Sequence, residues 1–277
     1  MEFSSNTLTI HEEGNLFYTT FPSFDRTGKV HHAFSTRRGG MSQGFYASLN
    51  LGFKRGDDAQ TVMRNFQRMS QATGIYCGDM VFSDQVHGDR ILYVDQQYRG
   101  SGILKQPMLE QVDGLITDKK HVALVTFHAD CVPLFFLDPV REVIGLAHAG
   151  WKGTLKKIGA SMVRRMQEDH GCVPADILVG IGPSIGPCCF EVGEDVYRPF
   201  REAFPAQAGS LLLPAATEDK RYLDLWQANE AALLEAGITQ AHITVTDLCT
   251  KCHPDYYFSH RFAGSRRGTQ AAFLELY

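Results

Sequence analysis

The chain has 277 residues, which allows one large domain or two small ones. Apolar residues make up 44% and charged residues 21%, close to the averages of soluble globular proteins, so a disordered or fibrous chain is excluded. The net charge of −4 excludes a broad basic face for nucleic acid, although it is compatible with a local basic pocket for a phosphate group.

The chain begins without the basic start and unbroken apolar run of a signal peptide, and no window reaches the roughly 18 apolar residues of a membrane span. We therefore expect a cytoplasmic protein with no membrane partner. Seven cysteines, an odd number, are then expected to be reduced thiols or metal ligands rather than a disulfide framework.

In chain order, the apolar patterns predict strands at 16–21, 30–35, 122–137, 143–147, 177–181, 243–246 and 273–277, and residues 81–82 and 91–94 form short apolar runs. Helices are predicted at 59–73, 154–170, 195–204 and 225–236, with long surface loops at 96–112 and 206–220. Asp57–Asp58 is expected to cap the first of these helices and Asp224 the last, and Gly74 and Gly237 follow their ends. No repeat or linker divides the chain, so we predict a single domain over 1–277. Strand hairpins mixed with helical crossovers favour an α+β layered fold with mixed sheets.

One predicted hairpin places a thiol opposite an imidazole. Residues 138–141, Asp-Pro-Val-Arg, are typical of a β-turn, and strands folded back around it would pair residues whose numbers sum to 279, so that Cys131 faces His148. Opposed Cβ atoms lie about 4.5–5.5 Å apart, which suits zinc bonds of about 2.3 Å to sulfur and 2.1 Å to nitrogen. Pro133 cannot donate to the ladder, so a bulge there could shift the register. The alternative is a buried cysteine and a core histidine that only pack, and the hairpin alone does not exclude it.

Other cysteines and a glycine-rich turn carry weaker signals. Residues 180–187, Gly-Ile-Gly-Pro-Ser-Ile-Gly-Pro, follow a predicted strand, but the two prolines remove amide donors, so we interpret them as a structural turn. Cys249 and Cys252 form a Cys-x-x-Cys motif without a second such pair, so a structural zinc is not predicted there. Cys188 and Cys189 are assigned no role.

Arg37 ends a predicted strand in the segment Ser35-Thr-Arg-Arg-Gly-Gly40 and offers a planar fork to a phosphate or carboxylate. The alternative is an exposed arginine at a strand end, which the local sequence supports equally.

Several motifs occur together in one order: Gln85-Val-His-Gly88, Ala129-Asp-Cys131, His148-Ala-Gly-Trp-Lys-Gly153, Gly182-Pro-Ser-Ile-Gly186 with Phe190-Glu-Val-Gly193, and Cys249-Thr with Phe258-Ser259. On these motifs the chain resembles the YfiH/YlmD laccase-domain family over nearly its full length. The resemblance implies a layered α/β-β/α sandwich, distantly like the catalytic domain of cytotoxic necrotizing factor.

The resemblance also implies site residues. The family's metal-binding histidine falls on His87, and its other two ligands fall on Cys131 and His148. The family's Ser-x-Arg motif falls on Ser35 and Arg37, which we expect to bind substrate. The chain departs from the family at its C-terminal arginines, where it reads Ser-His-Arg-Phe at 259–262 and Gly-Thr at 268–269, so that Arg266 or Arg267 would have to substitute.

Older descriptions of the family name copper polyphenol oxidases. Later ones name phosphorolysis of adenosine, inosine, guanosine and methylthioadenosine and deamination of adenosine. A laccase needs a copper cluster held by many histidines, and this chain has no His-x-His pair. Three protein ligands with an open position are typical of catalytic zinc, so we expect zinc, with copper as the second choice. Purine nucleosides and phosphate are the expected partners of a monomer or homodimer.

The expected mechanism assigns Asp130, beside Cys131, to proton transfer in deamination, and Arg37 to holding the attacking phosphate. Asp130 has a simpler alternative, a strand-end aspartate that satisfies backbone amides. Two other functions remain open. One is a cysteine hydrolase with Cys131 as nucleophile and His148 as base. The other is a metal-binding protein without catalytic activity.

Overall fold

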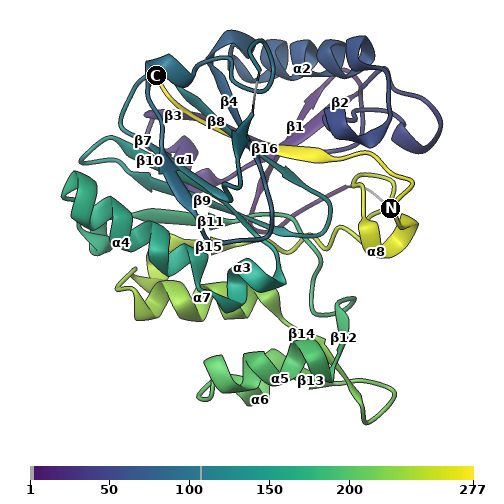
Figure 1. Ribbon diagram of the computed structural model, residues 1–277, viewed down its shortest axis with the longest axis vertical. Coiled ribbons are helices and arrows are strands. Elements are labelled where there is room, and N and C mark those ends of the chain that lie inside the picture. Colours follow the sequence, from purple (N-terminus) through teal and green to yellow (C-terminus); the bar gives the residue numbers. More distant parts are fainter. Residues whose placement is uncertain (1–2, 107) are drawn as a thin grey trace.

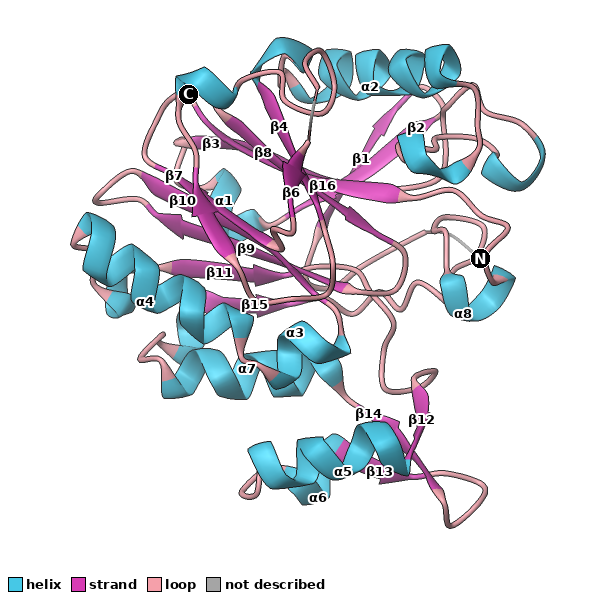
Figure 2. Cartoon of the chain, in the orientation of Figure 1, coloured by secondary structure: helices cyan, strands magenta, loops and turns pink. Residues whose placement is uncertain are grey.

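Two β-sheets stack face to face between outer layers of helices (Figure 1, Figure 2) in this computed structural model, which describes residues 3–106 and 108–277. The larger sheet has seven strands in the order β1-β2-β3-β16-β8-β4-β6. Their bounds are Thr9–Glu13 (β1), Leu16–Thr20 (β2), Val30–Ser35 (β3), Met80–Asp84 (β4), Leu109–Glu110 (β6), Ala123–His128 (β8) and Gln270–Leu276 (β16).

The second sheet has six strands in the order β15-β11-β9-β10-β7-β5 and mixes parallel with antiparallel pairs. Their bounds are Ile91–Tyr93 (β5), Gly114–Thr117 (β7), Val132–Asp138 (β9), Val143–Ala149 (β10), Leu178–Ile181 (β11) and Ile243–Val245 (β15).

Helices cover the outer face of each sheet. Helix α2 (Ala59–Thr73) lies on the seven-stranded sheet, and α3 (Trp151–Leu155), α4 (Ile158–His170) and α7 (Leu225–Glu235) lie on the six-stranded one (Figure 2). Two short helices lie elsewhere, α1 (Pro22–Asp25) after β2 and α8 (His260–Ala263) before β16.

A small third sheet, ordered β12-β14-β13, projects from the main body next to α3 and α7 (Figure 1). It packs with α5 and α6, and its elements are Glu191–Gly193 (β12), Glu194–Ala203 (α5), Ala208–Leu211 (α6), Leu212–Pro214 (β13) and Lys220–Leu223 (β14).

The core explains this layering. Strands β9 and β10 are buried along their whole length, because one face meets the seven-stranded sheet and the other meets the helices. Phe135 and Leu146 face the space between the sheets, whereas Phe136 and Ala147 face the helical layer that contains Met162. A strand buried on both faces has no polar alternation, and this is why residues 132–137 of β9 show an unbroken apolar run in the sequence.

The predicted α+β sandwich with mixed sheets is therefore confirmed, and so are the predicted caps. The side chain of Asp58 accepts a hydrogen bond from Thr61 N at the start of α2, and Gly74 ends that helix in a left-handed conformation. Asp224 accepts from Gln227 N at the start of α7. Within the described residues, no helix combines the length and the apolar character needed to cross a membrane.

Two predicted elements are wrong because a residue with positive φ interrupts them. The strand at 122–137 is divided into β8 and β9 at Asp130, whose φ is 87°. The helix at 154–170 is divided into α3 and α4 at Lys157, whose φ is 56°. Non-glycine residues adopt this conformation at a cost of about 1–3 kcal/mol, so apolar periodicity alone gives no sign of either break.

The predicted register of the β9–β10 hairpin is also wrong. Paired residue numbers sum to 281 rather than 279, so His148 pairs with Pro133 and Val143 with Asp138. The reason lies in the turn, where the Asp138 carboxylate accepts from the amides of Val140 and Arg141 and the connection lengthens to four residues. A shift of two residues preserves the face of every side chain, because side chains alternate with period two.

A buried carboxyl pair lies at one end of β16. Glu275 is buried beside Asp79, which forms an ion pair with Arg99. Burial and the charge of Asp79 raise the pKa of Glu275 to about 8. The raised pKa means that the folded state favours the protonated form of Glu275. Protonated Glu275 therefore contributes its full stabilisation below the unfolded pKa of about 4.3, and this stabilisation is lost as the pH rises through the folded pKa of about 8.

We predict that Glu275→Gln removes the loss of folding stability at high pH, because a glutamine amide donates to Asp79 at every pH. Relative to wild type, the free energy of unfolding of the variant should rise by about 1–3 kcal/mol between pH 5 and pH 9. Urea unfolding at a series of pH values measures it, with the exposed Glu12→Gln as control. Parallel pH profiles for wild type and Glu275→Gln would contradict the prediction.

Candidate metal centre and active site

A large cavity opens where the two sheets meet the small third sheet. Its volume is about 860 Å³. The wall combines the ends of β4, β8 and β10, the start of α3 and the segment before β16. The lining residues used below are Lys54, Arg55, Asp84, His87, Phe127, Asp130, Cys131, His148, Trp151, Phe190, Arg261, Arg267 and Thr269.

Three of these side chains converge in the cavity wall, where His148 is buried and His87 is exposed. His87 lies in the loop after β4, Cys131 lies in the break between β8 and β9, and His148 lies on β10. Their ligand atoms are all within 4.8 Å of one another, and the two imidazole rings are 4.9 Å apart between centroids. The structure thus brings together the three residues that the sequence analysis grouped. Cys131 and His148 meet although the register differs, because the two-residue shift leaves both on one face.

Asp113, which the sequence analysis missed, positions two of these ligands. Its buried carboxylate accepts hydrogen bonds from the amides of Val86, His87 and Gly88 at 3.1, 3.0 and 2.8 Å. The same carboxylate lies 2.9 Å from Nδ1 of His148. An imidazole that donates from Nδ1 leaves Nε2 free as a ligand, which is the usual carboxylate–histidine–metal arrangement.

Charge couples Cys131 to His148. Burial alone would raise the pKa of the Cys131 thiol, but the charge and hydrogen bonding of His148, together with His87, outweigh it and lower that pKa to about 6. Burial alone would likewise lower the pKa of His148, but the Cys131 thiolate and Asp113 raise it to about 9. Without metal, the pair is therefore favoured as thiolate and imidazolium at neutral pH, and metal binding would displace the proton from Nε2 of His148.

Gly150 makes the close approach of these groups possible. A Cβ atom at this position would lie 2.7 Å from Cδ2 of His87 and 3.2 Å from Sγ of Cys131. Any side chain at residue 150 would therefore displace one of the ligands, and a glycine is required between β10 and α3.

The position of Cys131 depends on Asp130. Both carboxylate oxygens of Asp130 accept hydrogen bonds, from Thr250 Oγ1 at 2.6 Å and from the amide of Arg261 at 2.7 Å. Its backbone carbonyl accepts from Ile185 N. Asp130 lines the cavity, but these contacts are those of an aspartate that holds the chain in a strained turn.

Ser35 and Arg37 lie outside the cavity lining. Arg37 donates from Nε to Ala47 O and from Nη1 to Pro254 O, and its guanidinium lies 4.6 Å from the ring centre of Phe258. The hydroxyl of Ser35 is buried and accepts from the amide of Ala271. The structure therefore does not bring these two residues to the three ligands.

Two other arginines do reach the cavity. Arg55 donates from Nε to Thr269 Oγ1, and Arg267 donates from Nη1 to Gly268 O. Burial and the neighbouring charge of Arg55 lower the pKa of Arg267 to about 10, so it remains protonated at neutral pH. Nε of Arg267 is buried without a hydrogen-bond partner among the described residues. Two adjacent cations with an unused buried donor form a potential anion site.

The three ligands fit one metal ion. Two imidazoles and one thiolate form a donor set that transition metals bind, and the convergence of three protein ligands on an open cavity leaves one coordination position for water or substrate. Within 3–106 and 108–277, the other candidate metal groups are Cys188, Cys189, Cys249 and Cys252, and Asp79, His121 and Glu275.

We predict that Asp113→Asn weakens metal binding by about 10–100-fold, because an amide cannot accept from all four donors. Competition with a chromophoric zinc chelator measures this affinity. Asp118→Asn is the matched control, since Asp118 accepts from Tyr93 OH away from the cavity. Unchanged zinc affinity in a folded Asp113→Asn protein would show that the carboxylate does not position the ligands.

Comparison with known proteins identifies relatives of the chain. The pattern of the family described as multi-copper polyphenol oxidoreductase laccase matches residues 31–277. The purine nucleoside phosphorylase YlmD of Geobacillus stearothermophilus is 40% identical over 242 residues, which are 87% of this chain and 88% of that protein. Adenosine deaminase RL5, from an unknown prokaryotic organism, is 32% identical over 85% of this chain and 90% of its own length.

A solved structure supports the same relationship. The YfiH protein of Bacillus licheniformis superposes with a TM-score of 0.91 at 36% identity, over 98% of this chain and 100% of that chain. Sequence and fold therefore agree over almost the whole length. The chain belongs to the YfiH/YlmD family, which is described as multi-copper polyphenol oxidoreductase laccase.

Proposed function

We propose that this chain is a zinc-dependent enzyme of purine nucleosides, which cleaves adenosine, inosine, guanosine and methylthioadenosine with phosphate and deaminates adenosine. The observation that carries the proposal is the convergence of His87, Cys131 and His148 in the wall of a cavity of about 860 Å³. Relatives that are named purine nucleoside phosphorylase and adenosine deaminase support the substrate class.

Zinc is preferred because the described residues lack the donors of a multicopper cluster and because the three ligands leave an open coordination position. Multicopper oxidation requires a cluster of coppers held by many histidines. The candidate metal groups of the described residues contain at most two histidines each. A zinc ion held by His87, Cys131 and His148 would supply a Lewis acid able to polarise water or a substrate atom.

The cavity has the size and the walls that a nucleoside requires. Ligand pockets commonly measure about 300–1,000 Å³, and a purine is flat and stacks on aromatic rings. Phe127, Trp151 and Phe190 supply aromatic surface in the wall.

Phosphate is assigned to Arg55 and Arg267 rather than to Arg37. The first two lie next to each other in the cavity wall, whereas Arg37 lies outside the lining and donates from Nε and Nη1 to backbone carbonyls. The other cations of the wall are engaged: Lys54 pairs with Asp84, and Arg261 donates to Glu191 O. Asp130 is assigned to positioning Cys131, because both of its oxygens already accept hydrogen bonds.

The low pKa of Cys131 also supports a second candidate, a cysteine hydrolase in which the Cys131 thiolate attacks and His148 transfers the proton. The two functions differ in their need for metal. A protein that keeps full hydrolytic activity after exhaustive chelation, and loses it on alkylation of Cys131, would favour the hydrolase.

We predict that purified protein releases hypoxanthine from inosine only when phosphate is present, and converts adenosine to inosine without it. Both activities should disappear in His87→Ala, since this variant loses a ligand, and should persist in His121→Ala, an exposed histidine outside the cavity. Chromatography of the bases and nucleosides measures both reactions. If hypoxanthine appears neither with nor without phosphate, the phosphorylase function is excluded.

We predict that Arg267→Ala raises the KM for phosphate by about 10–100-fold, since charge-assisted hydrogen bonds contribute about 1.5–3 kcal/mol each. Deamination of adenosine and zinc content should change little, because neither uses phosphate. The neighbouring Arg266→Ala, outside the cavity lining, is the control, and Arg267→Lys should restore part of the affinity. Equal KM values in Arg267→Ala and Arg266→Ala would contradict this assignment.

A further inference from the structure

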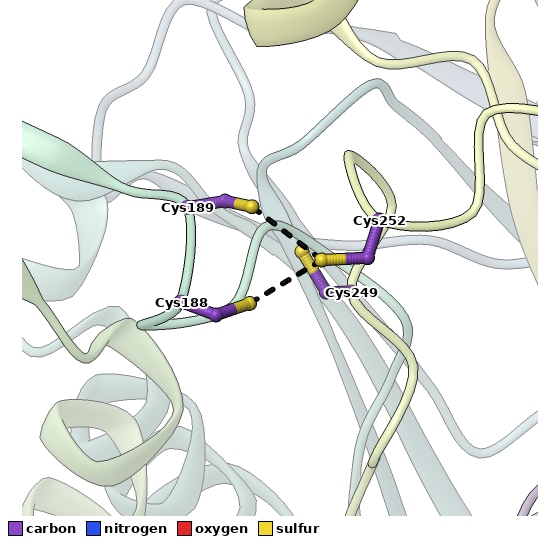
Figure 3. A group of neighbouring side chains, drawn as sticks. All are labelled: Cys188, Cys189, Cys249 and Cys252. Atoms are coloured by element: carbon purple, nitrogen blue, oxygen red, sulfur yellow. Dashed lines mark hydrogen bonds between the residues drawn. The ribbon is translucent and has the colours of Figure 1, made fainter.

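Four cysteines from two distant segments meet outside the cavity lining. Cys188 and Cys189 lie in the turn that precedes β12, and Cys249 and Cys252 lie in the turn that follows β15. Figure 3 shows the four side chains pointing toward one another. Their sulfur atoms are all within 4.8 Å of each other, and Sγ of Cys252 is 3.5 Å from Sγ of both Cys188 and Cys189.

We propose that Cys188, Cys189, Cys249 and Cys252 form a second metal site that binds one structural zinc ion. In a tetrahedral zinc tetrathiolate with Zn–S bonds of about 2.3 Å, neighbouring sulfurs are about 3.8 Å apart. The two separations of 3.5 Å from Sγ of Cys252 lie close to this value, and the other separations are at most 4.8 Å. A disulfide would require an S–S distance of about 2.05 Å, and all four cysteines are free thiols in this structure.

The spacing also selects a single ion over a larger cluster. Iron–sulfur clusters hold several irons and inorganic sulfides between their cysteines, so the thiolates stand apart by the width of the cluster. Four sulfurs within 4.8 Å of one another leave room for one ion only. A closed set of four thiolates with no position left for water is typical of a structural site.

The backbone around the site is built for this convergence. Ser184 and Cys249 form a parallel bridge, and Thr250 N donates to Ser184 O at 2.9 Å, so the two segments are already aligned. Cys249 and Cys252 are three residues apart in one turn, the spacing found in zinc ribbons. The turn at Cys188 and Cys189 allows both neighbouring residues to face the same side, and it supplies the second pair that the sequence motif lacked.

A backbone amide supports the ligand at the buried corner of the site. The amide of Gly186 donates to Sγ of Cys249 at 3.2 Å. Amide donors around a thiolate orient it and tune its affinity for metal. Cys188 and Cys252 are exposed, so an ion can enter from solvent, whereas Cys249 is buried.

The position of the site gives it a structural role. Thr250, next to Cys249, donates to the carboxylate of Asp130, and Ile185 donates its amide to the carbonyl of the same residue. Phe190, next to Cys189, lines the cavity. A zinc ion at the four cysteines would therefore fix the two loops that hold Asp130 and shape one wall of the cavity.

Metal stoichiometry of the purified full-length chain, prepared without chelators, tests the proposal. Cys252→Ser and Cys188→Ser should each bind one zinc fewer than wild type, while Cys77→Ser, a half-buried cysteine outside the group, should match wild type. This difference of one is expected whether or not the cavity site is loaded, so the result is independent of the proposed function. His87→Ala should lose the other ion and keep this one.

A second measurement guards against misfolded variants. In the His87→Ala background, cobalt should give the intense thiolate-to-cobalt absorption of a tetrahedral sulfur site, and added Cys252→Ser should abolish it. Three results would overturn the proposal: equal zinc content in Cys252→Ser and wild type, iron in place of zinc at this site, or two blocked thiols in the denatured, unreduced protein, which would indicate a disulfide.

Discussion

The buried carboxylate of Asp113 is the contact on which the metal centre depends. It collects three backbone amides of the loop after β4, which belongs to the seven-stranded sheet, and the imidazole of His148 on the six-stranded sheet. One side chain therefore ties a loop of one sheet to a strand of the other. A buried carboxylate is stable only when its oxygens are satisfied by donors, and here the donors belong to the parts that carry the ligands.

The second constraint is the break between β8 and β9, where the chain passes from one sheet to the other. Asp130 holds a left-handed conformation there, and hydrogen bonds from Thr250 and Arg261 compensate its strain. The break turns Cys131 toward His148 in the cavity wall. Cys249 of the four-cysteine group is next to Thr250, which donates to Asp130. The proposed structural zinc and the candidate catalytic centre therefore share one network of supporting hydrogen bonds.

Much of the secondary structure could be predicted from interactions between residues close together in the sequence. Helix caps at Asp58 and Asp224 were predictable, because a cap depends on the few residues around it. The breaks at Asp130 and Lys157 were not, since a left-handed non-glycine residue is stabilised by distant partners. Cys131 and His148 were grouped correctly from a register that is wrong by two residues. The period of two along a strand fixes the face of a side chain even when the pairing shifts.

By itself, the sequence determined which side chains of the β9–β10 hairpin share a face, and its motifs determined the family, which supplied His87. Only the tertiary structure decided what surrounds these ligands. Asp113 and Arg55 carry no local signal, because they reach the cavity through the packing of two sheets and not through spacing in the chain, and only this packing selects Arg267 over Arg266. The same packing keeps Arg37 out of the cavity lining and joins Cys188 and Cys189 to Cys249 and Cys252. Periodicity acts over a few residues, whereas the convergence of loops depends on contacts between segments far apart in the chain.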